Sequence, residues 1–126
     1  MSAESVVREC LLAHGVKAVI RDATRHYFGG YYIVSLQVTA EVQVSAAWFD
    51  TAQEYEDALV RLGGSARFTR TLEKMAVPLD QVEAVQRSLL DSFEANLLVY
   101  LSRPDFPGRF VRSEYEKVLK PVSPRG

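Results

Sequence analysis

The sequence has a single cysteine, Cys10, among 126 residues, so no disulfide can form within one chain. Its apolar neighbours at helical spacing indicate a small packed side chain and not a nucleophile. No apolar run approaches the ~20 residues that a membrane-spanning helix needs. The first twenty residues carry Glu4, Arg8 and His14 where a signal peptide has its apolar core. We therefore expect a cytoplasmic protein that does not enter a membrane.

An excess of charge of one sign is also lacking, because 16 acidic residues nearly balance 15 basic ones. No overall positive field is expected to attract the phosphate backbone of a nucleic acid. The aromatic residues Tyr27, Phe28 and Tyr31, with Arg21 and Arg25, resemble the mixture that stacks bases in single-strand binders. Without a longer basic stripe, nucleic acid is a minor alternative.

Recognisable catalytic and cofactor motifs are missing. Two histidines and one cysteine lie far apart in sequence, so the spacing predicts no metal site. Gly29-Gly30 joins two predicted strands, whereas a phosphate-binding loop leads into a helix. No local Ser/His/Asp or Cys/His signature is present. We predict no metal and no cofactor, and the sequence leaves open whether the protein is an enzyme.

Alternating hydrophobicity is the strongest signal that is present. Residues 16–28 alternate as a strand does, and residues 31–44 do so more cleanly, with a row of valines on one face and polar side chains on the other. Such alternation is typical of an antiparallel sheet with one face on the core. Residues 65–76 alternate less cleanly and predict a third strand near an edge.

Helical spacing predicts the remaining elements. A short helix is expected over residues 4–14, a second from Asp50 to Gly63, and the longest from Leu79 to Tyr100 or Leu101. Pro104 and Pro107 prevent the longest helix from continuing. Residues 102–110 are therefore expected to form a folded-over loop before a last short helix at 113–119.

These elements predict an α+β fold: a three-stranded, mainly antiparallel sheet built on a long β-hairpin, with three to four helices packed on one face. We expect a single domain over residues 1–120 and a flexible tail at 121–126. A strand of fourteen residues exceeds the usual ~5 or 6. A homodimer, by sheet continuation or face packing, would support that length.

The hairpin has a conflict of register. With a regular two-residue loop at Gly29-Gly30, Arg21 and Arg25 would oppose Val38 and Val34 on the core face. Shifting the register by one residue, through a three-residue loop or a bulge near Asp22-Ala23, places Ile20 beside the valine row instead. We therefore predict an irregularity in this hairpin.

The turn from Thr24 to Tyr32 is the candidate site. His26 lies beside Arg25 and three tyrosines, so it could act as an acid, a base or a donor to an anion that Arg25 holds. Alternatively, it is a structural histidine at the sheet end, with a carbonyl partner and tyrosines stacked across the hairpin. Asp22 lies ~13 Å from His26 along a strand, so it is expected to meet an arginine or cap the irregularity.

Polar residues along the long helix add to the candidate site. Gln86 and Glu83 lie in or beside an apolar stripe and need partners, because an unsatisfied buried polar group costs ~1–3 kcal/mol. Arg67 and Arg70 are expected to pair with Glu83 or Glu73, or else to bind an anion. The candidate ligand or partner surface comprises Arg25, His26, Tyr27, Tyr31, Tyr32, Arg70 and Gln86.

Two functions follow from these features. The first is a homodimeric protein-interaction or regulatory module that uses the turn as its contact surface. The alternative is a small-molecule binding protein or enzyme, in which His26 and Arg25 hold an anionic ligand and Arg67, Arg70 or Gln86 completes the pocket across a dimer.

Overall fold

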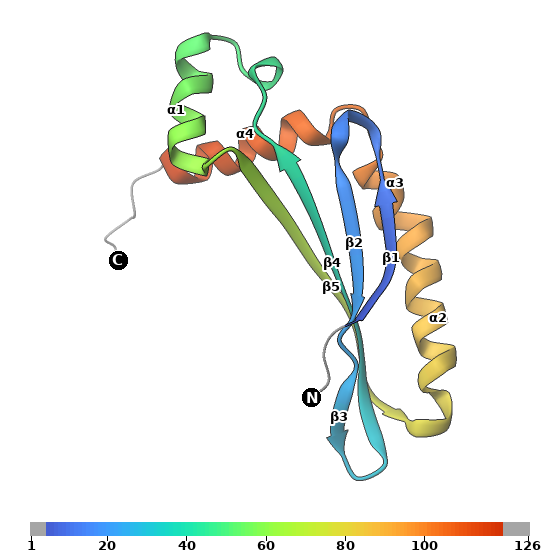
Figure 1. Ribbon diagram of the computed structural model, residues 1–126. Helices are drawn as coiled ribbons and strands as arrows, with labels where there is room; N and C mark the ends of the chain where they lie inside the picture. The colour runs from blue at the N-terminus through green and yellow to red at the C-terminus, as the bar shows by residue number, and fades with distance from the viewer. Residues whose placement is uncertain (1–4, 120–126) are drawn as a thin grey trace.

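The computed structural model describes residues 5–119; the predicted domain end at residue 120 and the predicted tail at 121–126 lie outside the described residues. One sheet runs through this part of the chain (Figure 1). Its five strands are β1 (Ser5–Leu11), β2 (Lys17–Asp22), β3 (Arg25–Phe28), β4 (Tyr31–Gln43) and β5 (Ser65–Pro78).

From residue 50 onward the helices follow the order that the sequence predicts. They are α1 (Ala52–Leu62), α2 (Val82–Ser92), α3 (Leu98–Leu101) and α4 (Phe106–Leu119). A π-helical segment, Phe93–Leu97, joins α2 to α3 without a break, and 3₁₀ turns occupy Ala13–Gly15, Ala46–Trp48 and Leu79–Gln81. The predicted long helix is therefore confirmed.

The sheet is antiparallel throughout, with β4 in its middle. β5 pairs with one edge of β4, β2 and then β3 pair with the other edge, and β1 pairs with the outer side of β2. The predicted α+β class with an antiparallel sheet is confirmed. The predicted number of three strands is wrong, because residues 5–11 add one strand and residues 17–28 form two.

The predicted helix over residues 4–14 is wrong, because residues 5–11 form strand β1 and Ala13–Gly15 form a 3₁₀ turn; Glu4 lies outside the described residues. The apolar residues of β1 fit a helical stripe, but two of them are the adjacent β-branched Val6 and Val7, which favour a strand. A bulge lies between Val6 and Arg8 in the pairing with β2. It shifts the alternation by one residue, so the strand imitates helical periodicity in the sequence.

The predicted irregularity of the hairpin is confirmed. Phe28 pairs with Tyr31 across Gly29-Gly30, and a bulge between His26 and Phe28 then shifts the register by one residue. Ile20 consequently pairs with Val38 and reaches the core. The bulge lies beside the turn and not at Asp22-Ala23, where β2 ends and β3 has yet to begin.

α2, the π-helical segment, α3 and α4 form a second layer over one face of the sheet (Figure 1). The buried row of β4, from Val34 to Val42, faces this layer together with Ala18 and Ile20 of β2, and meets Phe93, Leu97 and Leu101. α1 departs from the prediction, since it lies beyond the end of the sheet and packs against α4, where the Tyr115 hydroxyl donates to Asp57 Oδ2 at 2.7 Å.

α4 begins earlier than expected, because residues 106–110 form its first turns and not the end of a loop. Pro107 fits there, since the first turn of a helix needs no amide hydrogen from it. Phe106 and Phe110 stack at 5.6 Å and both contact Phe68 of β5. No helix among residues 5–119 is long and apolar enough to cross a membrane.

Candidate functional site

The β3–β4 hairpin extends beyond β1 and β2, with β5 beside β4 as far as Tyr31 (Figure 1), and its end carries exposed aromatic side chains. Its turn needs Gly29, whose φ of 57° strains any residue that has a side chain. The tight turn and the bulge direct Tyr27, Phe28 and Tyr31 outward, with exposed fractions of 45%, 62% and 43%. The cost of exposing three aromatic rings makes this end of the molecule a candidate contact surface.

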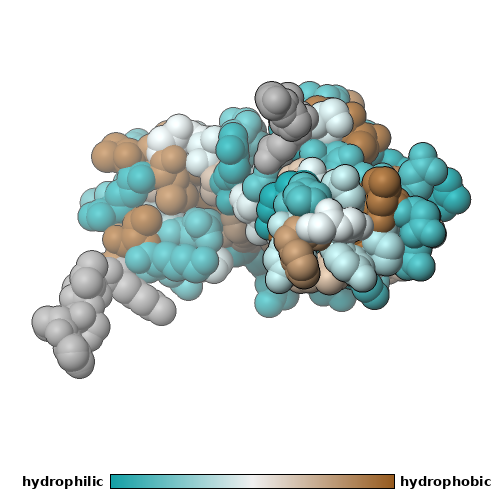
Figure 2. All heavy atoms as spheres, turned by 90° about the horizontal axis from the view of Figure 1, so that it is seen from below, coloured by the Kyte–Doolittle hydropathy of each residue, from teal (hydrophilic) through white to brown (hydrophobic). Residues whose placement is uncertain are grey.

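Contacts hold these rings in one group. Tyr27 meets Phe28 edge to face at 5.3 Å, and Phe28 meets Tyr31 at 6.0 Å between ring centroids. Leu79 is also exposed and donates its backbone N–H to the Gly30 carbonyl, which fastens the end of β5 to the turn. We call Tyr27, Phe28, Tyr31 and Leu79 the aromatic tip. When the molecule is viewed from the hairpin end, hydrophobic residues lie among residues of intermediate hydropathy and hydrophilic ones (Figure 2).

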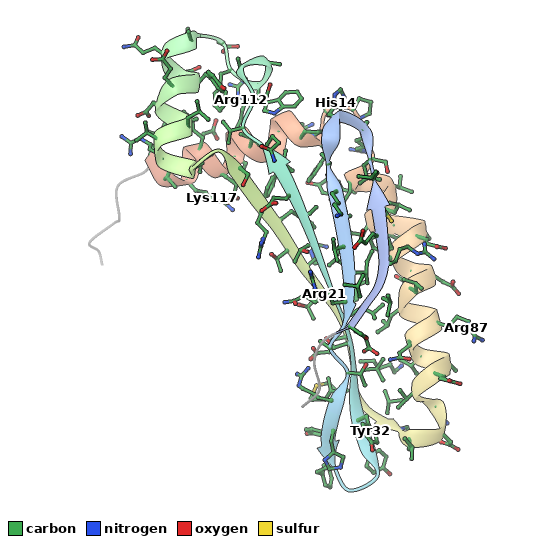
Figure 3. All side chains as sticks on the ribbon, in the orientation of Figure 1. His14, Arg21, Tyr32, Arg87, Arg112 and Lys117 are labelled. Carbon is green, nitrogen blue, oxygen red and sulfur yellow. The ribbon has the colours of Figure 1, made fainter. Side chains whose placement is uncertain are left out.

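His26 has a structural contact in this turn. Its Nε2 lies 2.6 Å from the Gly29 carbonyl oxygen, so Nε2 carries the hydrogen and donates it. Its ring meets Tyr32 edge to face at 5.3 Å, and Tyr32 lies near the turn end of β4 (Figure 3). This matches the carbonyl-bound, tyrosine-packed histidine predicted as the alternative to a catalytic one, although the side chain is exposed and not buried.

Arg25 and His26 lie on opposite faces of the sheet, because successive residues of a strand alternate. Arg25 Nη2 lies 3.7 Å from Glu73 Oε2 on the face without helices, and Glu73 Oε1 accepts from the Ser35 hydroxyl at 3.2 Å. The pairings expected for Arg67 differ as well, since Arg67 lies 3.8 Å from Glu41. The two residues expected to share an anion therefore do not converge on one point.

A polar network fills the break between β2 and β3 on the helix-covered face. Gln86 of α2 donates to Asp22 Oδ2 at 2.8 Å and to the Thr24 hydroxyl at 3.3 Å, which supplies the partner that Gln86 was expected to need. Asp22 Oδ1 accepts from the Thr24 backbone N–H at 2.9 Å. Asp22 thus caps the break between β2 and β3, whereas the bulge that it was expected to cap lies nearer the turn.

Two clefts flank the long helix. One holds about 330 Å³ between β5 and the π-helical segment and is lined by Arg70, Leu72, Ser92, Phe93, Asn96, Leu97 and Tyr100. The other holds about 310 Å³ on the β1 side and is lined by Val7, Leu36, Glu83, Gln86, Arg87 and Leu90. Arg87 extends from α2 toward solvent (Figure 3). Arg70 and Gln86 therefore serve different clefts, and neither cleft is lined by Arg25 or His26.

The cleft beside β5 has the features of a small-molecule site. Its volume is at the low end for such pockets, Phe93 and Leu97 give it a buried apolar floor, and π-helical turns occur often at functional sites. Arg70 lies 5.4 Å above the Phe68 ring and forms no ion pair with a carboxylate of the described residues. Sequence patterns alone gave no signal for the π-helical segment.

Within residues 5–119, no group of three or more histidine, cysteine, aspartate or glutamate side chains is placed to hold a metal ion. No family model, curated protein or solved structure matches the chain.

Proposed function

We propose that the protein is a homodimeric protein-interaction module that contacts another protein through its aromatic tip. The exposure of Tyr27, Phe28 and Tyr31 at the end of a projecting hairpin is the observation that supports this function. Aromatic residues are enriched where proteins bind one another, and each buries 150–250 Å² when it is covered.

The tip is built to bind without much reordering. The Gly29 carbonyl is held by His26, and the Gly30 carbonyl by the Leu79 backbone N–H, so both carbonyls of the turn are fixed before contact. Fixing a loop in its bound shape lowers the entropic cost of association. Because the hairpin projects, the partner that fits it is a protein with a concave, mainly apolar pocket.

The test is a variant with Tyr27→Ser, Phe28→Ser and Tyr31→Ser, compared with a matched surface variant that carries Leu11→Ser and Val60→Ser. Leu11 and Val60 are each 82% exposed but lie far from the tip in the fold, on β1 and α1. Proteins retained by the natural chain from its own cells would be purified and rebound to each variant. The proposal expects at least tenfold weaker rebinding for the tip variant and unchanged rebinding for the control. Equal binding by all three chains would remove the tip as the contact surface.

A second function, binding of a small anionic molecule, is favoured by the cleft beside β5. Arg70 would take the anionic group, and the Leu72, Phe93 and Leu97 side chains would cover an apolar body. Native mass spectrometry of gently purified protein tests this function. A retained non-protein mass that disappears in Arg70→Ala, but stays in Arg67→Ala, would support this function. Spectra of the natural protein and of Arg67→Ala that show the protein mass alone would oppose it.

We further propose a cytoplasmic location, which fits a chain with one cysteine.

A further inference from the structure

The outer edge of β5 is the longest sheet edge of the described residues. β5 runs for 14 residues and, within residues 5–119, pairs with β4 alone. Its middle is exposed, including Arg67, Thr69, Arg70, Thr71 and Glu73. An unpaired strand of this length presents a row of backbone donors and acceptors that can pair with another chain.

The backbone groups that face this edge can be assigned. The Val44 N–H donates to the Gly64 carbonyl at 2.9 Å, directly before the first pair of the β4–β5 ladder. Hydrogen-bonded pairs alternate with non-bonded pairs in an antiparallel ladder. The even-numbered residues of β5 up to Lys74 therefore bond to β4. Residues 67, 69, 71 and 73 turn their N–H and C=O groups to the free edge.

We propose that two copies of the protein join by antiparallel pairing of β5 with β5, across a two-fold axis at Arg70. This inference rests on the homodimer of the proposed function and names its interface. The two sheets then form one continuous sheet, and the helices of both protomers cover the same face.

The regular part of β5 selects the position of the axis. The ladder with β4 is regular from Ser65 to Lys74 and is then interrupted by a bulge, where Ala76 adopts a φ of 56°. A second copy centred on Arg70 overlaps almost the whole regular stretch with itself. This register also places odd residues opposite odd residues, as the outward-facing backbone groups require.

Side chains on the helix-free face are complementary in this register. Arg67 of one protomer lies opposite Glu73 of its partner, and Thr69 lies opposite Thr71 of its partner, each pair occurring twice by symmetry. The internal pairs of Arg67 with Glu41 and of Glu73 with Arg25 extend the contact into a row of alternating charge.

On the helix-covered face, apolar pairs lie next to the axis, and the next pairs outward set Ala66 of one protomer opposite Lys74 of its partner. Phe68 of one protomer lies opposite Leu72 of its partner, so two hydrophobic pairs flank the axis. Moving the axis to Thr71 would instead oppose Phe68 to Lys74 and Arg67 to Met75, which loses both the ionic and the apolar pairs. The chosen register has one unfavourable element, since the two Arg70 side chains meet at the axis.

The experiment is disulfide trapping in a Cys10→Ala background, which removes the only natural cysteine. In this register Arg70→Cys opposes itself and is expected to give a chain of twice the 14.1 kDa monomer mass after mild oxidation. Thr69→Cys and Thr71→Cys are expected to cross-link when mixed with each other, and much less when each is oxidised alone.

The outcomes separate this inference from the proposed function. A protein that is dimeric by light scattering but gives no cross-link through Arg70→Cys uses another interface, which overturns the inference and leaves the homodimer standing. Cross-linking of Thr69→Cys or Thr71→Cys with itself would show a shifted register and also overturn it. A monomer at all concentrations would end both the homodimer and the inference.

A proline substitution gives an independent check. The Thr71 N–H is not used by the β4–β5 ladder, so Thr71→Pro is expected to keep the circular dichroism spectrum and to abolish the dimer, because it removes one hydrogen bond from each protomer and blocks the edge. Thr71→Val keeps the N–H and should remain dimeric. A folded Thr71→Pro variant that stays fully dimeric would contradict the proposed edge pairing.

Discussion

The Thr24 hydroxyl replaces a backbone carbonyl in the sheet, because it accepts a hydrogen bond from the Ser35 backbone N–H at 3.2 Å. In a regular ladder the Ala23 carbonyl would accept this bond, since Ala23 donates its own N–H to the Ser35 carbonyl at 2.9 Å. The chain thus changes from β2 to β3 without leaving the edge of β4. Asp22 and Gln86 bond to Thr24 and fix this arrangement from the sheet and from α2.

Thr24→Val is expected to lower the free energy of unfolding by about 1–3 kcal/mol, because the new side chain keeps the shape but leaves the N–H of the buried Ser35 without a partner. Chemical denaturation at low protein concentration measures the change. Thr39→Val on β4 is the control, since it loses only a weak 3.5 Å contact with Arg21 and should change the stability by less than about 0.5 kcal/mol. Equal losses in both variants would mean that the Thr24 bond has no special role.

The contact between α1 and α4 is expected to make stability depend on pH at both extremes. The hydrogen bond from Tyr115, and next the bond from Arg61, lower the pKa of Asp57 below its ordinary 3.8. The same bond to Asp57, followed by burial, raises the pKa of Tyr115 above its ordinary 10.0. Asp57 therefore contributes stability above pH 3.8 that is lost as the pH falls and the carboxylate protonates. Tyr115 contributes stability below pH 10.0 that is lost as the pH rises and its hydroxyl ionises.

Tyr115→Phe removes the shared bond, so its stability should vary less with pH than that of the natural protein in both windows. Denaturation midpoints measured across the acid and alkaline ranges test this prediction. Tyr27→Phe at the exposed aromatic tip is the matched control and should follow the natural protein. If Tyr115→Phe also follows it, the bond does not control either titration.

The sequence predicted those elements whose hydrophobic periodicity matches the face that they bury in the core. β4 alternates because one face lies on the core, and the helix from residue 79 to 101 has a continuous apolar stripe. β1 could not be predicted in this way, because its bulge after Val6 displaces the alternation and its position at the sheet edge leaves Leu11 82% exposed. Pairing with β2, which is a tertiary contact, decides its conformation.

The candidate site shows the same limit. Arg25 and His26 are neighbours in the sequence, which suggested a joint anion site, but adjacent strand residues point to opposite faces. Gln86 could be predicted to need a partner, although its partners Asp22 and Thr24 are more than 60 positions away. The exposed rings of Tyr27 and Tyr31 followed from a turn that the two glycines indicate directly.

Gly108→Ala is expected to destabilise the protein by about 1 kcal/mol, although alanine normally favours a helix over glycine by about that amount. A Cβ at position 108 would lie 3.0 Å from Trp48 Cε3, and the indole is held by its hydrogen bond to the Gln43 carbonyl at 3.1 Å. The cost of overpacking therefore exceeds the gain in helix propensity. In a Trp48→Leu background the same change should stabilise the helix, and thermal denaturation of the four chains measures the difference. A stabilising effect in the natural background would show that the indole moves freely.

Arg70 and Arg67 are expected to act in opposite directions on self-association. Arg70→Thr removes the like charges that meet at the proposed two-fold axis, so it should tighten the dimer by about two- to fivefold. Arg67→Thr removes the partner of Glu73 across the interface, so it should weaken the dimer by a similar factor. Both variants lose one positive charge from the same strand, which makes each the control for a general effect of net charge. Dissociation constants from sedimentation equilibrium test the pair. If both variants shift the constant in the same direction, net charge and not the proposed register governs the association.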